Sequence, residues 1–406
     1  MMKIAYVSFE YPPETGFGGI ATYVYQASNL LAQRGNTVEV FSASMKEDSS
    51  VFQNGIWVHR VKCDRETFNQ KITTIFSKRH NEIGFDILES PEYGADGICL
   101  ARQFSDVCFI VKTHTPTFLI NKINPSPNPN WINRARMFIG AIRRFKSPLL
   151  FNKYNKEVDP EYQMAQMADV LTSPSISLQN IISSEWIIPK DNLLLQPYPY
   201  IPIPELYSIP IELNTNKNVT FIGRLEIRKG IPVLAEAIPA ILEKDPEIIF
   251  NFVGTPMPSP DKRYNMQEYL CIKLAKYRSN LVFHGNLDLI EIATVLKNTS
   301  LCIFPSIWEN FPNVCLEAMS AGRAIIGTNS GGMSEMLSND AGITIPPNDS
   351  IAIRHAVLNL IGNPSKRLEL GFNARQKIET QYSGNVIGAL MEKQYSDIMD
   401  RHNEKK

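Results

Sequence analysis

The chain has 406 residues, of which 44% are hydrophobic and 20% are charged, and its formal net charge is zero. This length predicts two domains, and the neutral balance gives no reason to expect a nucleic-acid partner. The six cysteines include no C-x-x-C pair, which argues against a disulfide framework and against a zinc site. No apolar run approaches the roughly 18 residues of a membrane span, and the first one stops at Glu10 without a cleavage site. We therefore expect a cytoplasmic protein.

Alternating strands and helices are predicted from the N-terminus onward. Residues Lys3 to Phe9 predict a buried strand, and a loop containing Gly18 and Gly19 leads from it into a helix. Glycines at the first turn of a βαβ unit are typical of doubly wound domains. They do not complete a G-x-G-x-x-G pattern, so a dinucleotide site is only weakly indicated. The helix and the further strands predicted in this region cover residues 20–33, 38–42, 56–61, 85–88 and 108–112.

Polar residues follow two of these strands. Glu89 and Glu92 come after one strand, and His114 stands two residues past the strand that ends at Lys112. Ligands of parallel sheets bind beyond the carboxyl ends of the strands, which makes His114 a candidate site residue, although a lone histidine is usually structural. The loop with Glu89 and Glu92 could face a substrate, or Glu89 could cap the helix that follows.

A basic segment interrupts this alternation. Residues "NPSPNPN" cannot form regular structure, because proline lacks the amide donor and restricts its predecessor. The next stretch, Trp131 to Lys146, has one apolar stripe at helical spacing with arginines beside and behind it. Such a basic amphipathic helix could lie on an anionic membrane surface, or it could pack on the core and expose its basic face to solvent.

A proline-rich connector marks the predicted domain boundary. Five prolines fall between Gln196 and Pro210, which favours a stiff, extended linker. We therefore expect an N-terminal domain over residues 1–198, a C-terminal domain over residues 199–380 and a closing helix within residues 381–406.

The second half contains cations and carboxylates at strand ends. Arg224 follows the strand Val219 to Ile222, and Lys229 stands five residues later at a predicted helix start, a spacing that suits a diphosphate. Farther on, a strand ending at Phe304 leads through a loop with Glu309 into a helix from about Asn313 to Ser320, which contains Glu317. The free N–H groups at such a helix start can bind an anion. A carboxylate can accept two hydrogen bonds from a vicinal diol, so a nucleotide sugar is a candidate ligand.

These patterns carry a family resemblance. Glu309 and Glu317, followed by "AMSAG" and "GGMSE" and preceded by "GR…KG", resemble the donor-site signature of the family 4 retaining glycosyltransferases, also described as glycosyl transferases group 1. The resemblance spans nearly the whole chain and is strongest from Val219 to Glu335. It implies an α/β chain with the GT-B fold, in which two doubly wound Rossmann-like domains face a central cleft. It also implies that the last helix crosses back to the first domain.

The resemblance further implies roles for single residues. Arg224 and Lys229 would hold the leaving diphosphate, Glu317 the ribose hydroxyls and Glu309 the hydroxyls of the donor sugar. His114 would lie near the transferred sugar, and Gly18-Gly19 would place bare backbone near the donor phosphate and the acceptor. The remaining donor-site residues expected from the motifs are Gly223, Phe311, Pro312, Asn313 and Val314.

The implied activity is a retaining hexosyl transfer, of the EC 2.4 type, from a nucleotide-diphosphate sugar. The expected acceptor is a carbohydrate or a lipid-linked molecule of cell-envelope polysaccharide synthesis, at the inner face of the plasma membrane. No D-x-D motif occurs, so we expect neither a metal nor another cofactor. The sequence departs from the family where Glu89 and Glu92 occupy a region in which many members have a histidine. Pro312 and Ala324 also replace a common glycine and proline.

Two alternatives remain open from the sequence. One is another GT-B chemistry, such as a nucleotide-sugar epimerase or a phosphorylase. The other is a non-catalytic module that binds a nucleotide sugar. The set of Arg224, Lys229, Glu309 and Glu317 favours a transferase, because a binding module has no need of cations for a leaving group.

Overall fold

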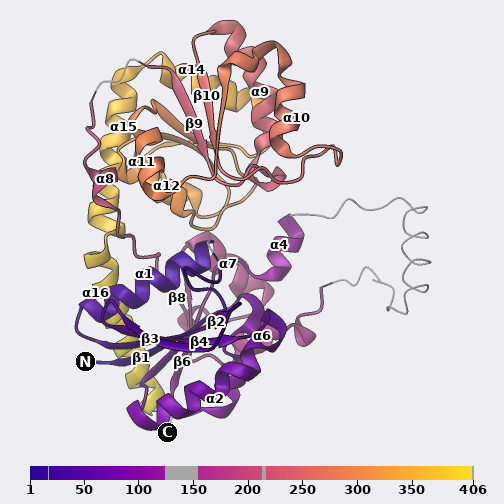
Figure 1. The fold of residues 1–406 in the computed structure, drawn as a ribbon. Coiled ribbons are helices and arrows are strands. Elements are labelled where there is room, and N and C mark those ends of the chain that lie inside the picture. Colours follow the sequence, from indigo (N-terminus) through magenta and orange to yellow (C-terminus); the bar gives the residue numbers. More distant parts are fainter. Residues whose placement is uncertain (17, 124–153, 213–215, 405–406) are drawn as a thin grey trace, which may run out of the picture.

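The computed structural model describes residues 1–16, 18–123, 154–212 and 216–404, which form two α/β domains (Figure 1). The predicted basic helix, Trp131 to Lys146, lies outside the described residues. The α/β fold class with two Rossmann-like domains is confirmed, because each domain is built on a largely parallel sheet with helices on its faces.

The N-terminal sheet has eight strands in the order β3-β4-β2-β1-β5-β6-β7-β8. Its strands are β1 Lys3–Val7, β2 Thr37–Ser44, β3 Ser49–Gln53, β4 Ile56–Lys62, β5 Ile87–Pro91, β6 Cys108–Lys112, β7 Val170–Ser173 and β8 Leu193–Leu195. Among the described residues, β3 runs antiparallel to β4 at one edge and the other pairs are parallel. The central strands are buried on both faces, which explains why their sequences are nearly continuous apolar runs.

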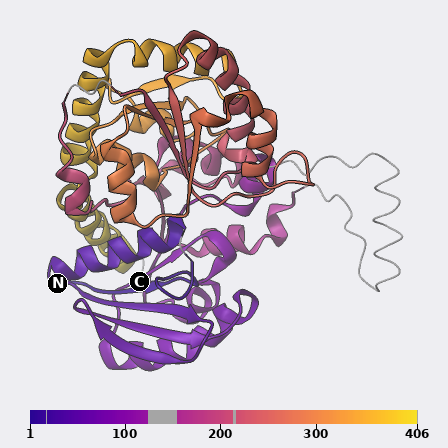
Figure 2. The same ribbon diagram turned by 45° about the horizontal axis from the view of Figure 1, so that its top comes forward.

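The helices of this domain cover both faces of the sheet. They are α1 Gly19–Gln33, α2 Arg65–Ile83, α3 Ile98–Gln103, α4 Thr117–Ile123, α6 Pro160–Met167 and α7 Ile176–Glu185. Helix α1 lies on the side that faces the C-terminal domain in both views (Figures 1 and 2).

The C-terminal sheet has six parallel strands in the order β11-β10-β9-β12-β13-β14. Its strands are β9 Asn218–Ile222, β10 Ile249–Val253, β11 Leu281–Gly285, β12 Leu301–Phe304, β13 Ala324–Thr328 and β14 Ile343–Ile345. Its helices are α9 Ile231–Lys244, α10 Met266–Lys273, α11 Leu289–Lys297, α12 Asn313–Ser320, α13 Met333–Met336, α14 Ser350–Ile361 and α15 Pro364–Lys377. Strand order turns back at β9 and β12, so the carboxyl ends of these two central strands flank the position where ligands of doubly wound sheets bind.

Two segments of chain connect the domains side by side. The first is the linker that contains α8 (Pro204–Tyr207), and the second runs through a π-helical turn, Ile378–Tyr382, into α16 (Gly384–Glu404). The backbone N–H of Tyr200 in the linker donates to the carbonyl of Tyr382 in the return segment, at 3.0 Å.

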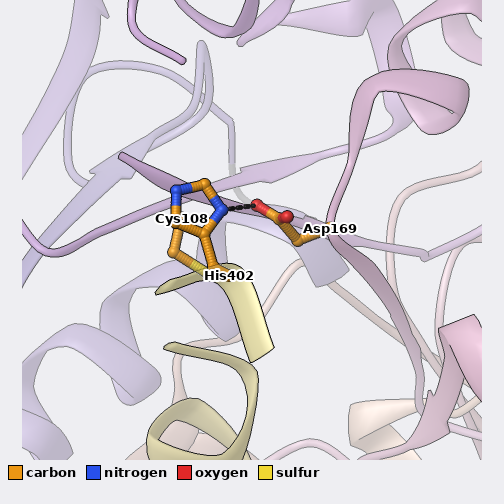
Figure 3. Close-up of side chains that lie close together, drawn as sticks. All are labelled: Cys108, Asp169 and His402. Atoms are coloured by element: carbon orange, nitrogen blue, oxygen red, sulfur yellow. Dashed lines mark hydrogen bonds and ion pairs between the residues drawn. The ribbon is translucent and has the colours of Figure 1, made fainter. Parts of the chain in front are cut away.

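Helix α16 packs along the N-terminal domain (Figure 1). The hydroxyl of Tyr395 is buried, donates to the carboxylate of Glu89 and lies 3.2 Å from the hydroxyl of Tyr6. Near the end of the helix, the Nδ1 atom of His402 lies 2.9 Å from a carboxylate oxygen of Asp169, beside Cys108 (Figure 3). The helix therefore contributes core residues to the domain at the other end of the sequence.

The fold contains elements that the sequence-based expectations lacked, among them helix α2 and the edge strand β3. The buried residues of α2 form one narrow stripe, Phe68, Ile72 and Phe76, which gives a weak periodic signal. Helix α15 ends at Lys377, where the chain widens into the π-helical turn that begins the return to the N-terminal domain. None of the described helices is both long enough and apolar enough to cross a bilayer.

We predict that Arg375 secures the linker to the C-terminal domain. Its guanidinium donates to the carbonyls of Ser320 and Ile209, both at 2.8 Å, and to that of Tyr207 at 3.3 Å. Arg375→Ala leaves these partly buried carbonyls without a donor and should lower the free energy of unfolding by roughly 2 to 4 kcal/mol. Thermal denaturation measures this, with Arg263→Ala as the control, because Arg263 forms an exposed pair with Asp261. Equal melting temperatures for the two variants would contradict the prediction.

Candidate active site

The loop after β12 forms the centre of the candidate site. Glu309 in this loop forms a parallel bridge with Gly331, and the N–H of Gly332 donates to the carbonyl of Glu309 at 2.9 Å. A Cβ atom would lie 2.0 Å from the Glu309 carbonyl oxygen if placed on Gly331, and 1.9 Å from that of Asn310 if placed on Gly332. The Gly-Gly pair after β13 is therefore required for the two loops to pack together.

Glu309 is buried and held by two cations. One carboxylate oxygen lies 2.5 Å from the Nζ atom of Lys229 and 3.5 Å from a guanidinium nitrogen of Arg228. Burial disfavours the ionised form, but the charges of Lys229 and Arg228 outweigh this effect and lower the pKa of the Glu309 carboxyl. Glu309 is therefore a fixed negative charge near neutral pH.

The two predicted cations have different surroundings. Lys229 ends the turn Ile227–Lys229, which is pressed against the end of β12: a Cβ atom on Gly230 would lie 1.9 Å from the carbonyl oxygen of Pro305. Arg224 follows Gly223 at the end of β9, has 57% of its side chain exposed and pairs with Glu226 at 3.3 Å. The structure thus brings Lys229 to Glu309 and leaves Arg224 at the surface of the same strand end.

Arg228 was not among the residues predicted from the sequence. It contacts Glu226 at 3.0 Å in addition to Glu309. Its place next to Lys229 in the sequence could have indicated a site residue, because both side chains of a tight turn can reach the same strand end.

Glu317 has the opposite environment to Glu309. It lies on the second turn of α12, is 8% exposed, and one of its carboxylate oxygens has no hydrogen-bond partner among the described residues. Burial raises the pKa of this carboxyl to about 7. An orphaned buried oxygen of this kind is well suited to hydroxyl donors of a ligand.

The helices α1, α9 and α12, which follow the central strands β1, β9 and β12, begin at glycine-containing or proline-containing turns without a side-chain cap. The shorter helices α3, α8 and α13 also lack such a cap. By contrast, the helices α2, α6, α7, α10, α11, α14 and α15 each have an Asp, Asn or Ser side chain on a first-turn N–H. Uncapped first turns leave backbone N–H groups and the positive end of the helix dipole available to an anion.

The glycines at the start of α1 are open on one side. No described atom lies within 4 Å of a Cβ atom placed on Gly19, and the nearest to one on Gly18 is a carboxylate oxygen of Glu10 at 3.9 Å.

At the start of α12, Pro312 is the N-cap residue, and Asn313 and Val314 are the first two helical residues. Phe311 packs instead on Tyr198 and Tyr382, with ring centroids 5.5 and 5.2 Å apart, so its side chain belongs to the packing between the domains.

His114 is fixed at the end of β6 by Glu92. The backbone N–H of His114 donates to one oxygen of Glu92 at 2.7 Å, and its Nδ1 atom lies 3.3 Å from the other. The Nδ1 atom is also 3.2 Å from the carbonyl of Lys112. Both neighbours are acceptors, so Nδ1 carries the proton in the neutral ring. The Nε2 atom is buried, has no partner among the described residues and is free to accept from a hydroxyl.

Glu89 lies in β5 and Glu92 follows it, and the two side chains have different partners. Glu92 orients His114, and this contact between residues 22 positions apart could not be predicted from local sequence patterns. Glu89 accepts from the hydroxyls of Tyr23, at 2.6 Å, and Tyr395. The expectation that Glu89 caps the following helix is therefore wrong, because its side chain is engaged in the core by tyrosines that the strand pattern could not identify.

Two other polar sites in the described part of the chain contain none of the predicted residues. Cys108, Asp169 and His402 form a group of potential metal ligands, but they lie where β6 and β7 begin, opposite the end of β6 that carries His114 (Figure 3). Asp169 and His402 already bond to each other. A polar hollow between α11 and the sheet, lined by Asn251, His284 and Glu291 among others, is likewise separate.

Comparison with known proteins shows that the chain is similar to glycosyltransferases. Residues 208–377 match the family model described as glycosyl transferases group 1. An uncharacterized glycosyltransferase of Methanocaldococcus jannaschii is 26% identical over 403 residues, covering 95% of this chain and 96% of the relative. The structure is similar to that of sucrose-phosphate synthase from Thermosynechococcus elongatus, with a TM-score of 0.74, 19% identity and coverage of 99% and 100% of the two chains. It is also similar to HepE of Anabaena in complex with UDP, with a TM-score of 0.68, 14% identity and coverage of 98% and 100%. These matches and the two parallel-sheet domains show that the chain is a glycosyltransferase with the GT-B fold, whose residues 208–377 match glycosyl transferases group 1.

Proposed function

We propose that the enzyme transfers a sugar from a nucleoside-diphosphate sugar to an acceptor hydroxyl with retention of configuration. The observation that carries this proposal is the contrast between two buried glutamates at one strand end. Glu309 is held ionised by Lys229 and Arg228, whereas Glu317 has an oxygen without a partner. Such a site offers separate anchors for a charged diphosphate and for hydroxyl groups. HepE of Anabaena, a structural neighbour, has been solved in complex with UDP-glucose.

In the proposed reaction, the bond between the anomeric carbon and the β-phosphate oxygen breaks, and the electron pair leaves with the diphosphate. Arg224, Lys229 and the uncapped N-termini of α9 and α12 stabilise the negative charge that develops there. The acceptor oxygen bonds to the anomeric carbon from the same face, and its proton passes to the departing phosphate. No protein nucleophile, metal ion or other cofactor takes part in this scheme.

The hydroxyl groups of the donor are bound by three side chains in this proposal. Glu317 accepts from the ribose diol, which supplies partners for its orphaned oxygen. Glu309 accepts from hydroxyls of the transferred sugar. The Nε2 atom of His114 accepts from a further sugar hydroxyl, because Glu92 keeps the ring proton on Nδ1. Gly18 and Gly19 leave room for the phosphate or the acceptor at the start of α1.

The acceptor is the least defined part of the proposal. We propose a carbohydrate or lipid-linked acceptor of cell-envelope polysaccharide synthesis, used at the cytoplasmic side of the membrane. The basic stretch from Trp131 to Lys146 supports a peripheral contact with anionic lipids by its composition. Thermal shifts with UDP, GDP and ADP sugars would identify the donor, since a ligand at 100 times its Kd stabilises by about 2.7 kcal/mol. Release of nucleoside diphosphate that depends on added acceptor would then establish transfer.

We predict that Lys229→Ala and Arg224→Ala each lower kcat by about two to three orders of magnitude, because each removes a charge from the leaving group. Lys229→Ala should be the more severe, since it also removes the closest cation from the buried Glu309. Steady-state kinetics with the identified donor measures both. Lys276→Ala is the control, because its side chain is 75% exposed on the same domain. If Arg224→Ala and Lys276→Ala show the same activity, Arg224 does not act on the diphosphate.

A second prediction separates the two glutamates. Glu317→Ala should weaken binding of the free nucleoside diphosphate by roughly 1.5 to 3 kcal/mol, because the ribose hydroxyls lose a charged acceptor. Glu309→Ala should leave that affinity unchanged or slightly improved, since Lys229 is released to the phosphates, while kcat falls. Calorimetric titration of both variants decides this. Loss of nucleotide binding in Glu309→Ala alone would reverse the two assignments.

A third prediction follows from the raised pKa of Glu317. In the folded protein burial raises the pKa of Glu317 to about 7, so the carboxyl keeps its proton up to that pH, whereas in the unfolded chain it releases the proton near its ordinary pKa of 4.5. Stability is therefore lost as the pH rises from 4.5 to 7, by on the order of 3 kcal/mol in total. Glu317→Gln should raise the melting temperature of the ligand-free enzyme at pH 8 and leave it unchanged at pH 4. A rise of equal size at both pH values would show that ionisation is not the cause.

A further inference from the structure

The segment Trp308–Glu309–Asn310 joins the two domains at the candidate site. Glu309 forms an isolated parallel bridge with Gly331, and the three side chains of this segment have partners in different domains. The carboxylate of Glu309 forms an ion pair with Lys229 of its own domain. Trp308 is 8% exposed and belongs to an apolar cluster whose other buried members all come from the N-terminal domain.

Asn310 makes both of its side-chain contacts with the N-terminal domain. It is 6% exposed, and its Nδ2 atom donates to the backbone carbonyl of His114. Its Oδ1 atom accepts from the hydroxyl of Ser175 at 2.7 Å. Ser175 is the N-cap residue of α7, where its Oγ atom accepts from the N–H of Leu178 at 3.1 Å. The Nδ2 and Oδ1 atoms of Asn310 and the Oγ atom of Ser175 thus each have a partner.

A second contact holds the same end of α7. The carboxylate of Glu335, in α13 of the C-terminal domain, accepts from the backbone N–H groups of Ile176 and Ser177, both at 2.8 Å. A negative charge at a helix N-terminus is favourable, because it faces the positive end of the dipole. Hydrogen bonds at the start of α7 and at the His114 loop thus hold the two domains in a fixed relative position.

We propose that Asn310 is a positioning residue that sets the distance between His114 and the Glu309–Lys229 pair. Two neighbouring residues of this segment are anchored in different domains, Glu309 to Lys229 and Asn310 to the His114 carbonyl. The segment therefore fixes the two halves of the sugar site relative to each other. An amide fits both contacts of Asn310, because it offers donor hydrogens and an acceptor oxygen on separate atoms, whereas the similarly shaped aspartate carboxylate offers acceptors only. This inference rests on the proposed function, because it takes His114 and Glu309 as contacts of the transferred sugar.

The test compares Asn310→Ala with Asn310→Asp. The aspartate retains the acceptor for Ser175 and loses the donor for His114. In Asn310→Ala we expect faster amide hydrogen exchange in residues 113–118 and 175–179, and in Asn310→Asp in residues 113–118 alone. Both variants should lower kcat at least tenfold and leave the Kd for free nucleoside diphosphate within about twofold, because the nucleotide is bound by the C-terminal domain.

Asn280→Ala is the matched control, because Asn280 also makes two amide bonds, to the carbonyls of Pro246 and Ile248 within the C-terminal domain. It should change neither exchange in the two segments nor kcat. Ser175→Ala removes the hydrogen bond to Asn310 Oδ1 by changing the residue in the N-terminal domain, and it replaces Asn310→Ala in the test if that variant does not fold. The proposal is overturned if Asn310→Ala shows the hydrogen exchange and the kcat of the wild-type enzyme. It is also overturned by a tenfold loss of nucleotide affinity, which would show that Asn310 contacts the nucleotide directly.

The outcomes also separate this inference from the proposed function. If the wild-type enzyme transfers sugar from no donor, the proposed function fails. Hydrogen exchange in the same variants still decides whether Asn310 fixes the His114 loop.

Discussion

The ion pair between Lys229 and Glu309 is the interaction on which the rest of the site depends. A carboxylate as buried as Glu309 would take up a proton if it were alone, and an unpaired charge left there would be strongly destabilising. Its partner Lys229 stands on a turn that fits against β12 only because Gly230 has no side chain. The loop that carries Glu309 is in turn shaped by Gly331 and Gly332. The position of one charge therefore explains several glycines that are far apart in sequence.

Glu309 and Glu317 have the same side chain, but their different surroundings shift their pKa values in opposite directions. Glu309 has cations beside it and is ionised, whereas Glu317, on the second turn of α12, is buried without an ion-pair partner among the described residues and has a raised pKa. The uncapped starts of α1, α9 and α12 extend this contrast to the backbone. In the absence of a ligand, polar groups are left unsatisfied in the region where the proposed donor supplies phosphate and hydroxyl partners. The site gives up some stability of the free enzyme for complementarity to its ligand.

Local sequence patterns predicted what depends on local structure. The bounds of β12 and α12 follow from an apolar run closed by proline and from a helical period closed by Gly322, and both agree with the structure. The ion pair between Lys229 and Glu309 was not predicted, although it is explained by the parallel pairing of β9 and β12, whose carboxyl ends precede the two residues. Contacts between distant segments could not be predicted. Asn310 and His114 are 196 residues apart, and nothing in either neighbourhood encodes their hydrogen bond. The partnership of Glu92 with His114 and the packing of Phe311 between the domains were missed for the same reason.

The return of α16 to the N-terminal domain has a consequence for synthesis on the ribosome. Domains generally fold in the order in which they are made. Here the surface formed by Tyr6, Tyr23 and Glu89 is covered by Tyr395, which is fully buried there and emerges some 300 residues later than Glu89. The first domain to be translated is therefore the last to be completed. Until α16 arrives, Tyr6 lacks the neighbouring hydroxyl of Tyr395, and the carboxylate of Glu89 lacks one of the two tyrosine donors that it has in the complete domain.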